Sequence, residues 1–390
     1  MRFIIKYWNG KTLMKTKVII PDCKKFNGYK PCKPGKICDE NCNERVGMGT
    51  LILIINLDAM GDVLMTTAQL IPIKNKYPNS NIFWVTRKNA KGLLIHNPYI
   101  DKVLEWNFES VLYLQNMKFD VVFNADKSSS ACSLLNSLIA KAKYGFGLND
   151  LGAIIPINQA ADYNFILGID DYKKFKLNQR TGQDILAETF DLEYTRSEYI
   201  LNLTEEEKEF CNRFKLENDI KENDIVVGIN TGCSELYSNK KLTIEQHITL
   251  IKKLFQIDGI VILLLGGPED TERNKFIYNN FLDKIITTPT TEGIRKGICY
   301  ENIADIVITG DSFGMHLAIA LKKYVIAWFG LSCWTEIDLY GRGLKLFNES
   351  LECSPCWLKK CPHDLKCRDL VDIDRIVDEV KTLKLKSNKK

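Results

Sequence analysis

The sequence predicts an α/β fold with two doubly wound parallel-sheet domains that face each other across a cleft. The chain has 390 residues with 45% hydrophobic content, which is too long for one ordinary core and suits two domains. Short apolar strands alternate with helical segments in two successive series, the pattern of parallel sheets covered on both faces. Ligands bind at the carboxyl ends of the strands in such folds, so the residues that follow each strand are the candidate site.

The expected strands define four parts of the chain. These are a basic, Cys-rich extension (1–50), a first domain with a polar helical connection (51–215), a second domain (216–350), and a Cys-rich loop with a C-terminal helix and basic tail (351–390). The expected strands cover residues 51–56, 81–86, 102–106 and 119–126 in the first series and residues 225–232, 259–267, 284–288, 304–312 and 324–330 in the second.

The positive charge of the chain lies at its ends. Residues 1–50 hold eleven Lys/Arg against four Asp/Glu, within a formal net charge of +4 for the whole chain. Basic ends favour peripheral contact with an anionic surface such as the inner face of a membrane, although a merely solvated lysine-rich end explains them equally well. No motif interleaves aromatic and basic residues, so a nucleic-acid partner is not expected. Lysines interrupt any signal-peptide pattern and no apolar stretch is long enough to span a membrane, so we expect a cytoplasmic protein.

The stretch "INLDAMGDVLMTT" joins the first expected strand of residues 51–56 to a helix. Gly61 and Asp62 stand at the start of that helix, where an acid has two interpretations. Asp62 caps the helix, or its carboxylate faces the cleft as a general base. Asp58 lies in the same turn and is the alternative base.

Three junctions in the second half carry glycines and charged residues after a strand. Glycines let the backbone approach a ligand, a helix N-terminus favours phosphate, and a lysine adds a charge for a diphosphate. The alternatives are helix capping by Asp311 and Ser312 and a core position for His316. A dehydrogenase G-x-G-x-x-G and a Walker-type loop are both missing from the sequence. The candidates at these junctions are Thr231, Gly232, Lys240, Glu269, Asp270, Glu272, Asp311, Ser312, Phe313, Gly314 and His316.

The stretch "FNADKSS" ends another strand of the first domain. Asp126 and Lys127 are candidates to contact a ligand from that side, and capping of the next helix by Asp126 is the alternative, which we slightly favour.

Eight of the thirteen cysteines fall in two clusters. Four thiolates close in sequence can hold a structural zinc ion or an iron–sulfur cluster, although neither spacing is a standard zinc-ribbon pair and free thiols are the alternative. The two clusters are Cys23, Cys32, Cys38 and Cys42, and Cys353, Cys356, Cys361 and Cys367.

These stretches together resemble glycosyltransferase family 9, the heptosyltransferase family of bacterial surface-polysaccharide synthesis. The resemblance runs from about residue 51 to 380 through "LDAMGDVLMTTAQLIPIKNKYP", "NPYIDKVLEW", "VVGINTG", "LLLGGPED", "TGDSFGMHLAIAL" and "AWFG" in order. It implies the GT-B fold, in which two Rossmann-like domains face a cleft, one on the acceptor side and one binding the nucleotide sugar. It also implies transfer of a sugar with inversion, typically from ADP-heptose to a lipopolysaccharide or other lipid-linked or polysaccharide acceptor, without a cofactor for catalysis.

The resemblance assigns roles to individual residues. Asp62 matches the proposed general base and Lys240 the lysine at the donor diphosphate. Glu269, Asp270 and Glu272 compete for the acidic position near the ribose. The resemblance also matches Asp311, Ser312 and His316 to the donor-contacting stretch.

Two departures leave the donor open. Asn56 stands where the family often has Lys or Arg, and Phe313 where it often has Gly. The alternatives are therefore a transferase of the same fold that uses another nucleotide sugar, and a non-catalytic nucleotide- or glycan-binding member with metal-binding cysteine clusters.

Overall fold

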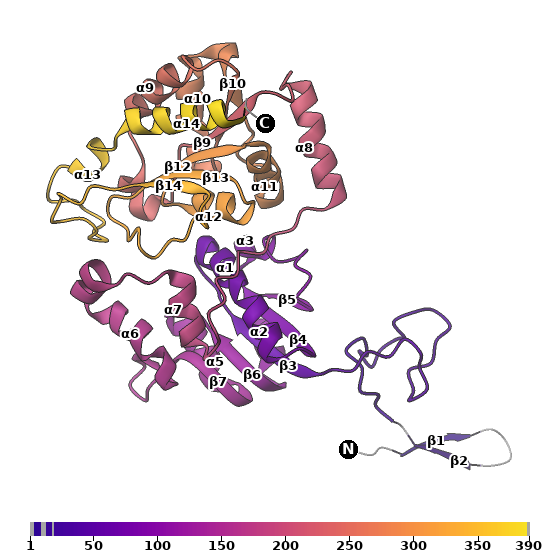
Figure 1. The fold of residues 1–390 in the computed structure, drawn as a ribbon. Coiled ribbons are helices and arrows are strands. Elements are labelled where there is room, and N and C mark those ends of the chain that lie inside the picture. The colour runs from indigo at the N-terminus through magenta and orange to yellow at the C-terminus, as the bar shows by residue number, and fades with distance from the viewer. Residues whose placement is uncertain (1–3, 9–12, 18, 388–390) are drawn as a thin grey trace.

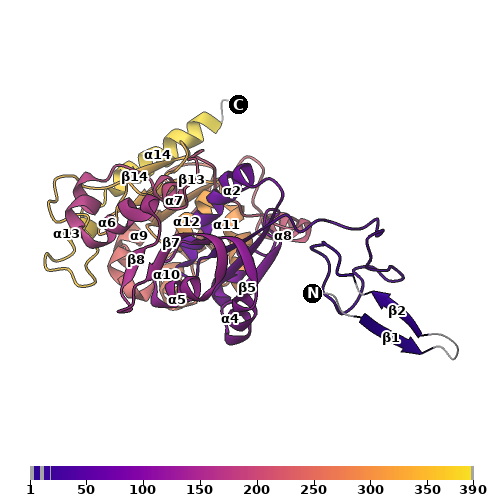
Figure 2. The ribbon, with the colours of Figure 1, turned by 90° about the horizontal axis from the view of Figure 1, so that it is seen from below.

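The computed structural model describes residues 4–8, 13–17 and 19–387 of the chain. Two six-stranded sheets, each with helices packed on it, form two domains stacked one above the other (Figure 1). The basic extension at the N-terminus projects away from both domains and carries a small antiparallel pair of strands, β1 (Ile4–Trp8) and β2 (Leu13–Lys17) (Figure 2).

The first domain is built on the sheet order β5-β4-β3-β6-β7-β8. Its central strand β3 is buried because it is a run of aliphatic residues, and Ile52, Leu53, Ile54 and Ile55 are fully shielded from solvent. All pairings in the sheet are parallel except that of the edge strand β8, which returns antiparallel to β7. The strands are β3 (Thr50–Ile55), β4 (Ser80–Thr86), β5 (Lys102–Glu105), β6 (Lys118–Asn124), β7 (Ile139–Leu148) and β8 (Ile154–Pro156).

The second domain repeats this plan with the wholly parallel sheet β11-β10-β9-β12-β13-β14. The two domains together confirm the predicted doubly wound α/β fold. The strands of this sheet are β9 (Ile225–Asn230), β10 (Ile260–Leu265), β11 (Ile286–Thr287), β12 (Ile306–Gly310), β13 (Tyr324–Trp328) and β14 (Gly343–Leu346).

In each sheet the chain order reverses at the centre, between β3 and β6 in the first and between β9 and β12 in the second. Such a reversal opens a crevice at the carboxyl ends of the two strands. The helices that begin there are α1 (Met60–Thr66) after β3, α5 (Ser129–Ser137) after β6, and α12 (Phe313–Ala320) after β12. Helices α1 and α12 pack against each other where the two domains meet (Figure 1). The crevices at the strand ends therefore face one another.

The remaining helices cover the sheets and connect the domains. Helix α8 lies at the end of the expected connection, but it packs against α11 of the second domain. There the Cys211 thiol donates to the carbonyl oxygen of Cys299 at 3.3 Å. The helices that cover the sheets and connect the domains are α2 (Leu70–Lys76), α3 (Lys88–Lys91), α4 (Phe108–Gln115), α6 (Asp162–Ile169), α7 (Gly182–Thr189), α8 (Glu205–Glu217), α9 (Ile244–Leu254), α10 (Thr271–Asn279), α11 (Ile294–Ile303), α13 (Lys366–Asp369) and α14 (Ile373–Ser387).

Among the residues that the structure describes, no helix is long and apolar enough to cross a membrane.

Candidate active site

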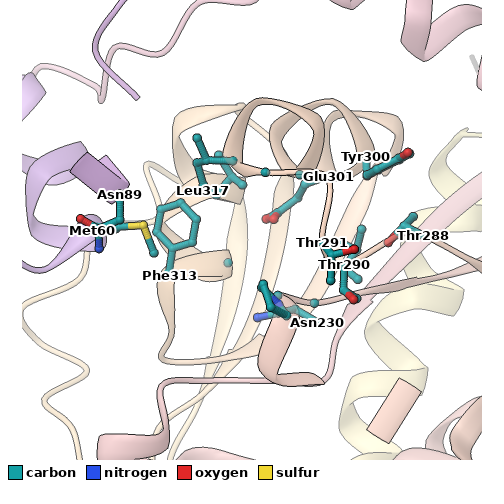
Figure 3. A pocket seen from close by; sticks show the side chains of 18 of the residues that line it. Met60, Asn89, Asn230, Thr288, Thr290, Thr291, Tyr300, Glu301, Phe313 and Leu317 are labelled. Atoms are coloured by element: carbon teal, nitrogen blue, oxygen red, sulfur yellow. The ribbon is translucent and has the colours of Figure 1, made fainter. Parts of the chain in front are cut away.

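A crevice of about 850 Å³ opens between the domains. Met60 and Asn89 line it from the first domain, and Phe313, Leu317 and Glu301 line it from helices of the second (Figure 3). The wall on the second domain combines the glycines and apolar residues of 265–268 with the threonines Thr288, Thr290 and Thr291. The charged groups singled out in the sequence do not line this crevice; they form a polar cluster beside it, around the α1–α12 contact.

The turn after β3 holds Asp62 in the third position of α1. The backbone N–H of Ala59 donates to Asp62 Oδ2 at 3.2 Å, so the capping interpretation of Asp62 is confirmed. This bond uses one carboxylate oxygen and leaves Oδ1 for a second partner. The alternative base, Asp58, is exposed in the same turn and pairs with Arg87.

Asp126 supports this turn from the neighbouring strand. It is 8% exposed, and it accepts hydrogen bonds from the side-chain amide of Asn56 at 2.6 Å and from the backbone N–H of Leu57. Burial raises the pKa of Asp126 to about 7, against the effect of these donors. Capping of α5 by Asp126 is wrong, because Ser128 is the N-cap residue there and accepts from the N–H of Ala131.

His316 joins the two domains at the α1–α12 contact. A Cβ atom on Gly61 would lie 2.5 Å from His316 Cδ2, so the imidazole packs directly on the bare backbone of the first domain. The ring stacks on Tyr199 with the centroids 6.1 Å apart, and Tyr199 Oη lies 3.3 Å from His316 Nδ1. Tyr199 belongs to the extended connection between the domains, and no local motif marks it in the sequence.

Lys240 and Asp311 form a shielded ion pair on the second domain. Lys240 Nζ lies 2.8 Å from Asp311 Oδ2, and the two side chains are 13% and 11% exposed. Asp311 directly follows β12, while Lys240 ends a 3-10 helix, Glu235–Lys240, that follows β9. The carboxyl ends of the two central strands therefore bring together residues 71 positions apart in sequence.

The charges of this cluster act on one another. Burial acts to raise the pKa of Asp311, but the charges of Lys240 and His316 and the hydrogen bonds from Lys240 and Ser332 together outweigh it and hold that pKa below its ordinary value. Burial lowers the pKa of His316, while the charges of Asp311 and Asp62 oppose the shift. Asp62 is exposed as a residue, yet the protein packed around its carboxyl raises the pKa of that group. The nearby Asp311 carboxylate adds to this rise, while His316 opposes it.

The start of α12 presents backbone N–H groups to the cluster. Ser312 is the N-cap residue, but its side chain makes no capping bond; Ser312 Oγ instead lies 2.8 Å from Asn230 Nδ2. Asp311 pairs with Lys240, so capping by the side chains of Asp311 and Ser312 is wrong. A Cβ at Gly314 would lie 2.4 Å from Asn230 Nδ2, which is why this position has no side chain. Uncapped N–H groups at a helix N-terminus attract anions.

The acid candidates after β10 occupy different environments. Asp270 is buried, accepts from the N–H of Gly267 at 3.0 Å and pairs with Lys241 at 3.5 Å, while Glu269 and Glu272 are exposed. A Cβ atom at Gly232 would lie about 2 Å from the Asp270 carboxylate, so this carboxylate packs directly on the backbone of the loop that follows β9. Thr231 is buried beside it and donates its hydroxyl to Asn274.

Two further charged residues lie near the cluster, one from each domain. Lys127 Nζ donates to Asn164 Oδ1 at 2.8 Å and so ties the turn after β6 to α6. Glu336, which the sequence did not reveal, comes from the loop after β13. Burial raises the pKa of Glu336 against the effect of the Lys174 charge, with Asp311 and Asp62 adding to the rise.

The cysteine clusters do not form a metal site in this arrangement. Within the parts of the chain that the structure describes, which include all eight cysteines, no group of three or more His, Cys, Asp or Glu side chains could hold a metal ion. All thirteen thiols are free. A structural zinc ion or iron–sulfur cluster is therefore without support.

The geometry defines a GT-B protein, with two doubly wound domains whose strand ends share one cleft. The chain belongs to glycosyltransferase family 9 (heptosyltransferase), whose profile matches residues 112–366. It is 26% identical over 182 residues to lipooligosaccharide heptosyltransferase 2 of Campylobacter jejuni, covering 44% of this chain and 56% of that relative. It is 24% identical over 298 residues to lipopolysaccharide heptosyltransferase 1 of Campylobacter coli, covering 72% of this chain and 83% of that relative.

Solved structures share the fold. A glycosyl transferase of family 9 from Veillonella parvula superposes with a TM-score of 0.66 at 19% identity, over 86% of this chain and 97% of that one. Escherichia coli ADP-heptose LPS heptosyltransferase II superposes with a TM-score of 0.65 at 16% identity, over 87% and 100%.

Replacing Gly61 by Ala tests the contact between α1 and α12. The new Cβ overlaps the His316 ring, and overpacking of this kind costs about 1–3 kcal/mol of the free energy of unfolding, measured in urea. Gly297→Ala is the matched control, because it also lies in a helix and its Cβ meets no atom within 4 Å. Equal stability of the two variants would contradict the contact.

Proposed function

We propose that this protein is an inverting glycosyltransferase that transfers a heptose from ADP-heptose to lipopolysaccharide or another surface-glycan acceptor. The observation that carries the proposal is the polar cluster itself. A carboxylate on the first domain, Asp62, faces a lysine and a helix N-terminus on the second, with His316 between the domains. The names of the relatives, among them an ADP-heptose LPS heptosyltransferase, support the donor and the class of acceptor.

Asp62 supplies the base in this mechanism. The acceptor oxygen attacks the anomeric carbon of the donor while the bond from that carbon to the diphosphate oxygen breaks, and the acceptor proton passes to Asp62. A carboxyl whose pKa is raised is a stronger base than an ordinary aspartate, and it remains ionised at pH values above that pKa. A single displacement of this kind inverts the configuration of the anomeric carbon.

The second domain holds the leaving group. The departing nucleoside diphosphate gains negative charge as the glycosidic bond breaks, and fixed positive groups stabilise that charge. Lys240 and the uncapped N–H groups at the start of α12 are the groups placed to do so. None of these steps requires a cofactor.

Asp62→Asn tests the base. The amide keeps the size of the side chain and an oxygen that can accept from Ala59, but it cannot take a proton. We expect turnover of ADP-heptose to fall about 10²- to 10⁴-fold while the affinity for ADP is kept. Asp58→Asn, in the same turn, is the comparison. Loss of turnover in Asp58→Asn with full turnover in Asp62→Asn would transfer the role of base to Asp58.

Comparing the pH profiles of the wild-type enzyme and Asp62→Asn tests the same role of Asp62. Because the base must be ionised and its pKa is raised, kcat/KM should increase with pH through a value above the ordinary aspartate pKa of 3.8. This limb should disappear in Asp62→Asn. If kcat/KM instead rises with pH through the ordinary aspartate pKa, the role of Asp62 as the base is contradicted.

Peripheral contact with an anionic membrane surface is part of the proposal, because the acceptor is lipid-linked and the extension is basic. Removing residues 1–48, which leaves β3 whole, should weaken sedimentation with vesicles rich in acidic lipid at least about tenfold at low salt. Neutral vesicles are the control. Unchanged binding to acidic vesicles would contradict a contact between the basic extension and the membrane.

A further inference from the structure

The Cys-rich loop, residues 351–367, folds back onto the strand ends that form the polar cluster. The backbone N–H groups of Cys356 and Trp357 donate to the carbonyl oxygen of Leu331 at 3.0 and 2.9 Å. Ser354 Oγ donates to the carbonyl oxygen of Gly330 at 2.6 Å. Gly330 and Leu331 lie just beyond β13, which neighbours β12 in the sheet, so these bonds fix the loop beside Asp311.

Trp357 lies against the ammonium group of Lys240. Lys240 Nζ is 4.5 Å from the centre of the Trp357 ring, and it also pairs with Asp311. Tyr237 packs edge-on against Trp357 with the centroids 5.2 Å apart, and its own ring lies 5.6 Å from the same Nζ. The backbone around the lysine is fixed as well, because Trp328 Nε1 donates to the carbonyl oxygen of Lys240 at 2.9 Å.

The same loop contacts the first domain. Lys174, in the π-helical turn Lys173–Leu177, places its Nζ 5.4 Å from the centre of the Trp357 ring. Lys176 Nζ donates to the carbonyl oxygens of Glu352 and Ser354 at 2.9 and 3.1 Å. The loop therefore links the lysine of the second domain to the helical segment of the first.

A ring suits this position better than a second carboxylate would. An aromatic face attracts a cation through its quadrupole and carries no net charge, so it orients the ammonium group without neutralising it. A long lysine side chain that is already held in place loses less conformational freedom when a ligand binds. The ring thus orients the Lys240 ammonium group without adding a second negative charge to that of Asp311.

We propose that Trp357 is a positioning residue that holds Lys240 for the donor diphosphate, and that this is the role of the Cys-rich loop at the site. The inference rests on the proposed function, since it takes Lys240 to be the diphosphate lysine. Trp357 itself has a left-handed backbone conformation with φ of 53°, which a tryptophan rarely adopts. The two N–H bonds to Leu331 hold this conformation and with it the direction of the ring.

A double-mutant cycle on the full chain, read out by calorimetric titration with ADP, tests the inference. We expect Trp357→Ala to weaken ADP binding about three- to tenfold, and Trp357→Phe, which keeps a ring, to weaken it less. In the Lys240→Ala background, Trp357→Ala should cause no further loss, because the group it positions is gone. Leu358→Ala is the matched control, because the Leu358 side chain is exposed on the same loop. Its backbone carbonyl, which accepts from Asn239 Nδ2, is kept in this variant. Thermal unfolding of each variant checks that the fold is kept.

The outcomes separate this inference from the proposed function. Loss of ADP affinity in Lys240→Ala but not in Trp357→Ala would overturn the positioning role alone. Losses that multiply in the double variant would also overturn it, because Trp357 would then act independently of Lys240. Full ADP affinity in Lys240→Ala would overturn the diphosphate role of the lysine, and the positioning role with it.

Discussion

The contact between Gly61 and His316 is the constraint on which the site depends. It brings the carboxyl ends of two parallel sheets face to face, because no side chain separates the first turn of α1 from the imidazole on α12. Each sheet by itself has only half of the charged groups. Asp62 and its supporting Asp126 come from one, and Lys240 and Asp311 come from the other. The chemistry proposed here exists only where the two meet.

The cluster balances opposite charges in a shielded space. Lys240 keeps Asp311 ionised, so the second domain offers a neutralised pair and not a bare positive charge when the nucleotide is absent. A diphosphate must then compete with Asp311 for the lysine, and a neutral aromatic ring is a support that does not add to this competition. On the facing domain, the protein packed around the Asp62 carboxyl raises its pKa, and the nearby Asp311 carboxylate adds to this rise. A general base benefits from that same shift.

The sequence predicted what is local in the chain. Aliphatic runs such as Ile52–Ile55 identify buried strands, and the polar residues that follow them must lie at the carboxyl edge of a sheet. The positions of Asp62 and Asp311 could therefore be predicted. Whether a side chain caps a helix could not: Asp62 does, while Asp311 is drawn away by Lys240 and Asp126 by Asn56 and Leu57.

No pattern in the sequence identifies the residues that reach the site through long-range packing. Tyr199 lies in an extended connection and Glu336 lies in a loop. Trp357 lies in a Cys-rich stretch for which the sequence predicted only a structural metal. Helix α8 reads as part of the connection because its sequence is polar, but its apolar stripe packs on α11 of the second domain. In each case the partner comes from a distant part of the chain, which periodicity and spacing cannot reveal.

A crystal structure of the protein with ADP bound would show whether the polar cluster holds the donor diphosphate. We expect the diphosphate oxygens to lie within hydrogen-bond distance of Lys240 Nζ and of the backbone N–H groups at the start of α12, on the side that faces Asp62. A diphosphate bound away from both, with the Lys240–Asp311 pair undisturbed, would contradict this role of the polar cluster.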